Sequence, residues 1–192
     1  AHATVSISGV SVHPGDAKGK MVNASSLACE FDGLLPASVR PQATEGFEGF
    51  NHLVAIEGNV DQATLRYILR NHDRKKLEEQ KQMFLKARQT LLSKYPKAEV
   101  RIEIGDDYRN MKEVHDAHPE AFNKAKAAYE KLGIAWNSHP IRGGTDGATF
   151  SFLGVPCPNL GTGAYNYHGR YEYLSVGEFK KMIEIVVEIL KI

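Results

Sequence analysis

The hydrophobic and polar positions of residues 1–107 change between the period of a strand and the period of a helix. Residues 3–9 alternate between apolar and polar, as in a strand with one buried face. After a loop over residues 13–20, the apolar positions recur at helical spacing. This helical stripe consists of Ala24, Leu27, Ala28, Phe31 and Leu35. The pattern therefore predicts a strand, a loop and a helix, in that order.

Three further strands and a second helix complete this part of the chain. Residues 53–57 and 63–69 have strand character, and Gly58-Asn59 between them is typical of a hairpin. A long charged helix with one apolar face follows, and residues 98–104 alternate again. The order β-α-β-β-α-β over residues 1–107 predicts a ferredoxin-like α+β domain, with one antiparallel sheet and two helices on one face.

Residues 108–192 have the pattern of α/β material with few strands. A helix is predicted from Phe122 to Leu132, ended by Gly133, and a shorter one over residues 146–153. Only residues 134–136 and 155–160 have strand or extended character. Two short strands are too few for a stable sheet, so this segment is expected to need partner strands from elsewhere.

A capping box at Ser175 and Glu178 predicts the start of a last helix. The side chains predicted to face inward from it are Phe179, Met182, Ile183, Val186, Val187 and Leu190. Without partner strands, these apolar helix faces are expected to form an exposed patch larger than monomers usually tolerate.

Composition excludes several classes of protein. Hydrophobic residues make up 42% and charged residues 24% of the 192 residues, and the formal net charge is +1, so no general attraction to nucleic acid or to a membrane surface is expected. No apolar run approaches the roughly 18–20 residues needed to span a bilayer. Cys29 and Cys157 lie far apart and outside any CxxC motif, which favours a reducing, cytoplasmic setting. The chain begins inside a strand and without Met, which is typical of a fragment.

Histidines are the first candidates for chemistry. His168 precedes Gly169 in a predicted loop, and imidazole is the commonest metal ligand. A lone histidine is more often structural, however, and catalytic zinc needs about three protein ligands. His115 and His118 lie three residues apart, but Pro119 follows and no set of carboxylates completes a site, so we interpret both as surface residues at a helix start.

Three other positions can bind substrate. Arg142 opens the turn 142–147, where a guanidinium can hold a carboxylate in a bidentate pair; the alternative is a tight strand-to-helix turn. His13, before Pro14, can stabilise an oxyanion or be an ordinary loop histidine. Arg70 ends a strand and can reach a carboxylate or be a solvated edge charge. From the pattern alone, both interpretations of each residue remain open.

Six segments of the chain, in order, resemble the peptidase T family. They are VSVHPGDAKGKMVNA (residues 10–24), TEGFEGFNHL (44–53), YILRNHDR (67–74), YRNM (108–111), PIRGGTDGA (140–148) and GVPCPNLGTGAYNYHG (154–169). The family consists of cytosolic tripeptide aminopeptidases among the co-catalytic zinc exopeptidases. The resemblance implies that residues 1–107 are a lid and dimerisation domain and residues 108–192 the C-terminal segment of the α/β catalytic domain, whose N-terminal part is absent.

The resemblance also implies roles for particular residues. His168 matches the family's last zinc ligand, and His13 matches a lid histidine that reaches a neighbouring subunit's active site and stabilises the tetrahedral intermediate. The positions that fall in substrate-facing motifs are Arg70, Arg142, Thr145 and Asn166. The other ligands of the two zinc ions and the glutamate general base have no counterpart here. At most a partial metal site is expected, and the chain alone is expected to be inactive.

The implied partners are tripeptides, a second copy of the chain bound through residues 1–107, and the missing N-terminal half of the catalytic domain. Neither nucleic acid nor a membrane is expected as a partner. The alternative is a non-enzymatic module in which residues 1–107 act only as a dimerisation or interaction unit.

Overall fold

The computed structural model describes residues 1–107 and 109–191. The chain divides into two compact units, Ala1–Asp107 and Tyr108–Ile192. Tyr108, the first residue of the segment YRNM, lies outside the described residues. Each unit has its own secondary structure, and the first is called the lid unit below.

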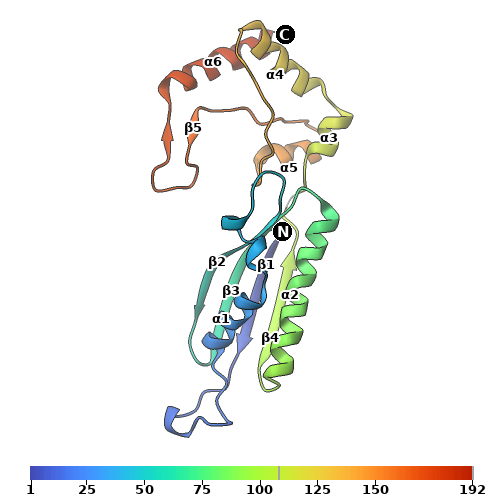
Figure 1. Ribbon diagram of the computed structural model, residues 1–192. Coiled ribbons are helices and arrows are strands. Elements are labelled where there is room, and N and C mark those ends of the chain that lie inside the picture. The colour runs from blue at the N-terminus through green and yellow to red at the C-terminus, as the bar shows by residue number, and fades with distance from the viewer. Residues whose placement is uncertain (108, 192) are drawn as a thin grey trace. The chain divides into compact units, whose positions relative to one another are not determined.

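The lid unit has the predicted ferredoxin-like fold (Figure 1). Its elements are β1 (His2–Ser8), α1 (Ala24–Leu34), β2 (Phe50–Gly58), β3 (Gln62–Arg70), α2 (Arg74–Lys94) and β4 (Glu99–Gly105). The four strands form one sheet in the order β2-β3-β1-β4, and every neighbouring pair is antiparallel. Both helices cover the same face of the sheet (Figure 1). The order β-α-β-β-α-β that the sequence predicts is therefore confirmed.

The core of the lid unit lies between this sheet and its two helices. Alternate strand residues point into it, so Val5 and Ile7 are 0% and 1% exposed. Phe31 of α1 and Phe84 of α2 are both fully buried, with ring centroids 6.2 Å apart. Tyr67 of β3 packs edge-on against Phe84 at 4.9 Å, and burial raises the pKa of its hydroxyl. Each such side chain contributes roughly 1.5–3 kcal/mol through burial.

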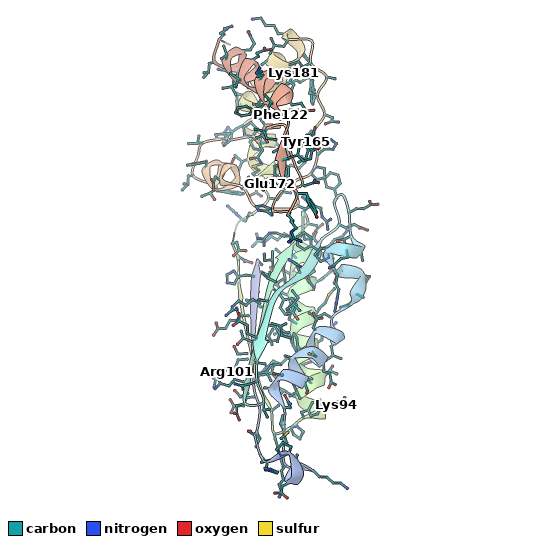
Figure 2. All side chains as sticks on the ribbon, turned by 90° about the vertical axis from the view of Figure 1, so that its left-hand side faces the viewer. Lys94, Arg101, Phe122, Tyr165, Glu172 and Lys181 are labelled. Atoms are coloured by element: carbon teal, nitrogen blue, oxygen red, sulfur yellow. The ribbon has the colours of Figure 1, made fainter. Side chains whose placement is uncertain are left out.

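The opposite face of the sheet is polar. Ser6, Arg66 and Arg101 point away from the helices and are exposed. Figure 2 shows Arg101 on this open face and Lys94 of α2 on the helix side. Antiparallel sheets commonly pack one face and hydrate the other, so this polar face needs no partner to cover it.

The second unit consists mainly of helices. They are α3 (Lys112–Ala117), α4 (Glu120–Lys131), α5 (Asp146–Phe152) and α6 (Val176–Lys191), with a small hairpin of β5 (Ala164–Tyr165) and β6 (Tyr173–Leu174). The predicted helices at 122–132, 146–153 and after Ser175 are confirmed. The short helix α3 and the hairpin were not predicted.

The strand predicted after α4 is wrong. Gly133, with φ of +65°, ends α4 as predicted, and the N–H groups of Gly133 and Ile134 close its last turn. The chain then brings Trp136 edge-on against Phe122 of α4, with centroids 6.1 Å apart. Residues 134–136 thus pack along their own helix and pair with no strand among the described residues. Residues 155–160 are likewise not in a strand.

The direction of α6 also differs from the prediction. Glu178 N–H donates to Ser175 Oγ at 3.4 Å, which forms half of the capping box, while the Glu178 carboxylate accepts instead from the Tyr165 hydroxyl at 2.7 Å. The buried residues of α6 are Ile185 and Glu188, on the side packed against α4. Of the six residues predicted to point inward, Met182 is half-buried and the other five are exposed: Phe179 43%, Ile183 51%, Val186 41%, Val187 45% and Leu190 81%. An exposed apolar helix face, expected for a segment without partner strands, is therefore confirmed for α6.

The contact between α4 and α6 depends on a buried carboxylate. Glu188 has a side chain only 8% exposed, and it pairs with Lys131 of α4 and with Lys191. The hydrogen bond from Lys131 holds the pKa of Glu188 below its ordinary value of 4.5. A carboxylate whose pKa is lower in the folded chain than in the unfolded chain stabilises the fold at a pH above the unfolded-state pKa. This stabilisation is lost as the pH falls through the folded-state pKa.

We therefore expect the α4–α6 pair to lose thermal stability as pH falls below about 4.5. Lys131→Met removes the partner, so it should lower stability at neutral pH and flatten the acid dependence. The measurement is thermal unfolding by circular dichroism from neutral pH to about pH 3. Lys180→Met, at an exposed position of α6, is the control and should leave the acid dependence unchanged.

Candidate functional site

His13 lies in a loop that leaves the sheet after β1 and extends beyond its end before α1 begins (Figure 1). Val10 and Val22 close the neck of this loop through two backbone hydrogen bonds of 2.8 and 3.0 Å. The imidazole is exposed, and its Nδ1 accepts the Gly15 N–H at 3.1 Å. The fold thus presents His13 at the surface with one ring nitrogen already engaged.

Arg70 lies at the other end of the same sheet. Its Nη1 donates to the Leu69 carbonyl at 2.9 Å and to Asp107 Oδ2 at 3.2 Å. The side chain is only 18% exposed, so it is not the solvated edge charge of the alternative interpretation. Contact with a substrate carboxylate stays a prediction for Arg70.

The turn 142–147 leads directly into α5, and Arg142 at its start is half-buried. Thr145 occupies the N-cap position, but its side chain makes no cap hydrogen bond. Thr145 Oγ1 instead accepts from Asn159 Nδ2 at 3.2 Å. A helix follows the turn, as the strand-to-helix alternative requires, but no strand precedes it within residues 109–141.

Ser151 and Gly147 fix the start of α5 against the segment that follows it. Ser151 is 2% exposed, and its hydroxyl donates to the Gly147 carbonyl at 2.7 Å and accepts the Cys157 N–H at 3.0 Å. A Cβ on Gly147 would lie 2.7 Å from the Cys157 carbonyl oxygen, so only glycine fits there. Ser151 and Asn159 were not predicted: Asn159 lies inside the segment 154–169, whereas Ser151 lies in none of the six segments.

His168 lies in the loop between β5 and β6. Asn166 and His168 have φ of 57° and 59°, a left-handed conformation that non-glycine residues adopt rarely. Asn166 Nδ2 donates to the Tyr171 backbone carbonyl at 3.1 Å, and the backbone carbonyl of Asn166 accepts the Gly169 N–H at 2.8 Å. The Asn166 side chain thus holds the loop while the His168 imidazole remains exposed. Strained backbone of this kind concentrates at functional sites.

The hairpin that carries this loop is tied to α6. Tyr165 and Tyr173 stack with ring centroids 5.1 Å apart, and the Tyr165 hydroxyl donates to Glu178. This hydrogen bond raises the pKa of Tyr165 above its ordinary value. The two-residue strands therefore gain side-chain support that their backbone hydrogen bonds alone would not supply.

The described residues do not assemble a metal centre. Across residues 1–107 and 109–191, no three His, Cys, Asp or Glu side chains come together in an arrangement that fits a metal ion. His168 can supply one ligand, which is short of the three that catalytic zinc needs. The interpretation of His115 as a surface residue holds only in part: the residue is half-buried, and both its ring nitrogens are buried near the end of α3. His118 is exposed just before α4.

None of the helices within the described residues is long and apolar enough to cross a membrane.

The chain thus consists of a ferredoxin-like unit followed by a loop-rich helical unit. A family model described as the peptidase dimerisation domain matches residues 1–96, half of the chain. The chain belongs to this family.

Its relatives agree with the resemblance seen in the sequence. Over all 192 residues the chain is 45% identical to peptidase T of Brevibacillus brevis, and it spans 47% of that protein. It is 44% identical to peptidase T of Staphylococcus aureus over 191 residues, again 47% of that protein. A tripeptidase structure from Staphylococcus aureus shares the fold, with a TM-score of 0.72 at 22% identity over 99% of this chain and 50% of that one. The chain thus spans about half the length of these relatives, and the predicted relation to peptidase T is confirmed.

Proposed function

We propose that this chain supplies the lid and the substrate-binding loops of a tripeptide aminopeptidase of the peptidase T type. The observation that carries the proposal is the 45% identity to a peptidase T over the whole of the chain, across both of its units. The reaction is removal of the N-terminal residue from a short peptide. The two free cysteines, Cys29 and Cys157, fit a reducing compartment such as the cytoplasm.

Each candidate residue has a proposed role in that reaction. His168 is one ligand of a centre of two zinc ions, whose other ligands and general base come from protein outside this chain. Arg142 and Thr145 bind the peptide from the turn before α5, and Asn166 orients the loop of His168. His13 donates a hydrogen bond to the oxygen that gains negative charge when the peptide carbonyl is attacked.

The geometry of the lid unit favours sites shared between two subunits. His2 pairs with Ile68 near Arg70, whereas His13 follows Ser8 at the far end of β1. The seven residues of β1 separate the two ends by about 20 Å at roughly 3.3 Å per residue. A tripeptide spans only about 10 Å. Arg70 and His13 of one lid therefore cannot both contact one peptide, and we propose that one of them serves the active site of the partner subunit.

We place the dimer contact at β2. This strand is one edge of the sheet and has nine residues, with no Pro or Lys among them. Its register shifts between Leu53 and Ala55, and the exposed side chains Val54 (53%) and Ile56 (45%) lie along it. The other edge, β4, presents Glu99, Arg101 and Glu103, charges of the kind that protect sheet edges from pairing. Two copies of β2 can pair across a two-fold axis and extend both sheets.

A non-enzymatic dimerisation module is the second candidate. It is favoured by one observation, that the family match covers residues 1–96 and stops within the lid unit. This candidate uses the β2 edge in the same way but assigns no chemistry to His168 or Arg142.

One experiment separates the two candidates. The chain is joined to the part of Brevibacillus brevis peptidase T that its match leaves out, and zinc-dependent hydrolysis of a tripeptide is measured. We expect hydrolysis in the joined protein and none from the 192-residue chain alone. A soluble, folded joined protein without activity would favour the module, and zinc-dependent turnover by the chain alone would contradict the missing-ligand argument.

A further inference from the structure

The loop that carries His13 has its own internal structure. Besides the bridge between Val10 and Val22, the Ala17 carbonyl accepts the N–H groups of Lys20 and Met21, both at 3.0 Å. A Cβ on Gly9 would lie 2.3 Å from the Val22 carbonyl oxygen, so the neck closes only with glycine there. The loop is thus a folded element with a fixed entrance.

Within this loop, Gly15 determines how the His13 ring is protonated. Pro14–Asp16 form a 3-10 turn, and His13 Nδ1 caps it by accepting the Gly15 N–H at 3.1 Å. A nitrogen that accepts a hydrogen bond carries no proton, so the neutral ring bears its proton on Nε2. His13 therefore has a donor on the side of the ring that points away from its own backbone.

Lys97 holds the other side of the loop. Its Nζ donates to the Gly19 carbonyl at 3.1 Å, although the two residues are 78 positions apart. Lys97 lies in the turn between α2 and β4, and Gly19 has φ of +72°. This hydrogen bond connects the His13 loop to the turn that follows α2.

We propose that the Gly15 N–H and the Lys97 ammonium are positioning groups for His13. Gly15 fixes the tautomer with its proton on Nε2, and Lys97 restrains the loop so that this N–H is presented at a constant place. His13 then meets the substrate as a hydrogen-bond donor through Nε2 and not as a general base. The donor role of His13 in catalysis rests on the proposed function of the chain. The positioning of the ring by Gly15 and Lys97 does not.

The structural part is tested on the 192-residue chain itself. Nitrogen NMR of the imidazoles at neutral pH should show the His13 proton on Nε2, and a ring protonated on Nδ1 would overturn the proposal. Lys97→Met should speed hydrogen exchange of residues 11–21 by about 2- to 10-fold, the effect of one exposed hydrogen bond. Lys94→Met is the matched control, because Lys94 pairs with Glu30 outside the loop. Equal exchange in both variants would remove Lys97 from the proposal.

The catalytic part is tested in the joined protein. His13→Gln keeps a side-chain N–H close to the place of Nε2, whereas the shorter amide of His13→Asn reaches only the place of Nδ1 and leaves no donor at that of Nε2. We expect kcat to be about 10-fold higher for His13→Gln than for His13→Asn, with similar KM values, in keeping with one transition-state hydrogen bond. Equal kcat values would overturn the donor role. If the joined protein has no activity, the proposed function fails, while NMR and exchange still decide whether Gly15 and Lys97 position the ring.

Discussion

His168→Ala is expected to abolish tripeptide hydrolysis in the joined protein. Its imidazole is exposed on a loop that other residues hold in place, so its removal takes away a ligand without disturbing packing. Mutation of mere supporting partners of a metal ligand typically costs 10–100-fold, so loss of the ligand itself should cost more than about 100-fold in kcat. Zinc content after dialysis should fall together with activity.

The control for this variant is His139→Ala. His139 is an exposed histidine of the same unit that lies outside the loop between β5 and β6. We expect its zinc content and activity to match those of the unchanged protein. Full zinc occupancy and activity in His168→Ala would show that His168 is an ordinary loop histidine and would remove the only metal ligand assigned to this chain.

The strands and helices of the lid unit could be predicted because packing against one core imposes the period. Val5 and Ile7 alternate with polar neighbours since β1 has a covered face and an open one. In α1 and α2 the buried positions, among them Phe31 and Phe84, recur at helical spacing for the same reason. The order of elements then leaves few topologies, and the observed sheet order β2-β3-β1-β4 is the ferredoxin-like one.

In the second unit, the periodicity of apolar residues does not determine which face of a helix is covered. The sequence of α6 identifies which residues are apolar, but not which neighbour covers them. Ile185 and Glu188 face α4, and the stronger apolar stripe that includes Ile183 and Val187 is exposed. The strands β5 and β6 have two residues each, too short to establish an alternation. Their hairpin depends on the stacking of Tyr165 on Tyr173, a contact that only the folded chain reveals.

The candidate site could be located from motifs, whereas its geometry could not. The segments with His13, Arg142 and His168 were recognised as units, but the left-handed backbone at His168 has no local sequence signal beyond Gly169. Arg70 was expected to be either solvated or bound to substrate; its pairing with Asp107 excludes the solvated alternative, and contact with a substrate stays a prediction. Such pairings join residues far apart in the chain, so spacing rules do not anticipate them.

The second large effect is expected at the edge of the lid sheet. Ile56→Lys should convert a dimer of the 192-residue chain into monomers at micromolar concentration, as measured by sedimentation velocity. Burial of an aliphatic side chain contributes roughly 1.5–3 kcal/mol, and the two-fold axis counts each substitution twice. The dissociation constant should therefore rise at least about 100-fold. Val54→Lys should act in the same direction, because Val54 is exposed on the same strand.

Two controls show whether the effect belongs to β2. Glu103→Lys also adds a lysine, but on the opposite edge strand β4, and should leave the dimer intact. Leu190→Asp alters the exposed apolar face of α6 and tests whether association occurs through the second unit instead. A dimer broken by Glu103→Lys would move the contact to β4, and one broken only by Leu190→Asp would move it to α6. An unchanged chain that is monomeric would contradict self-association through the lid, and then His13 and Arg70 could not serve sites in two subunits.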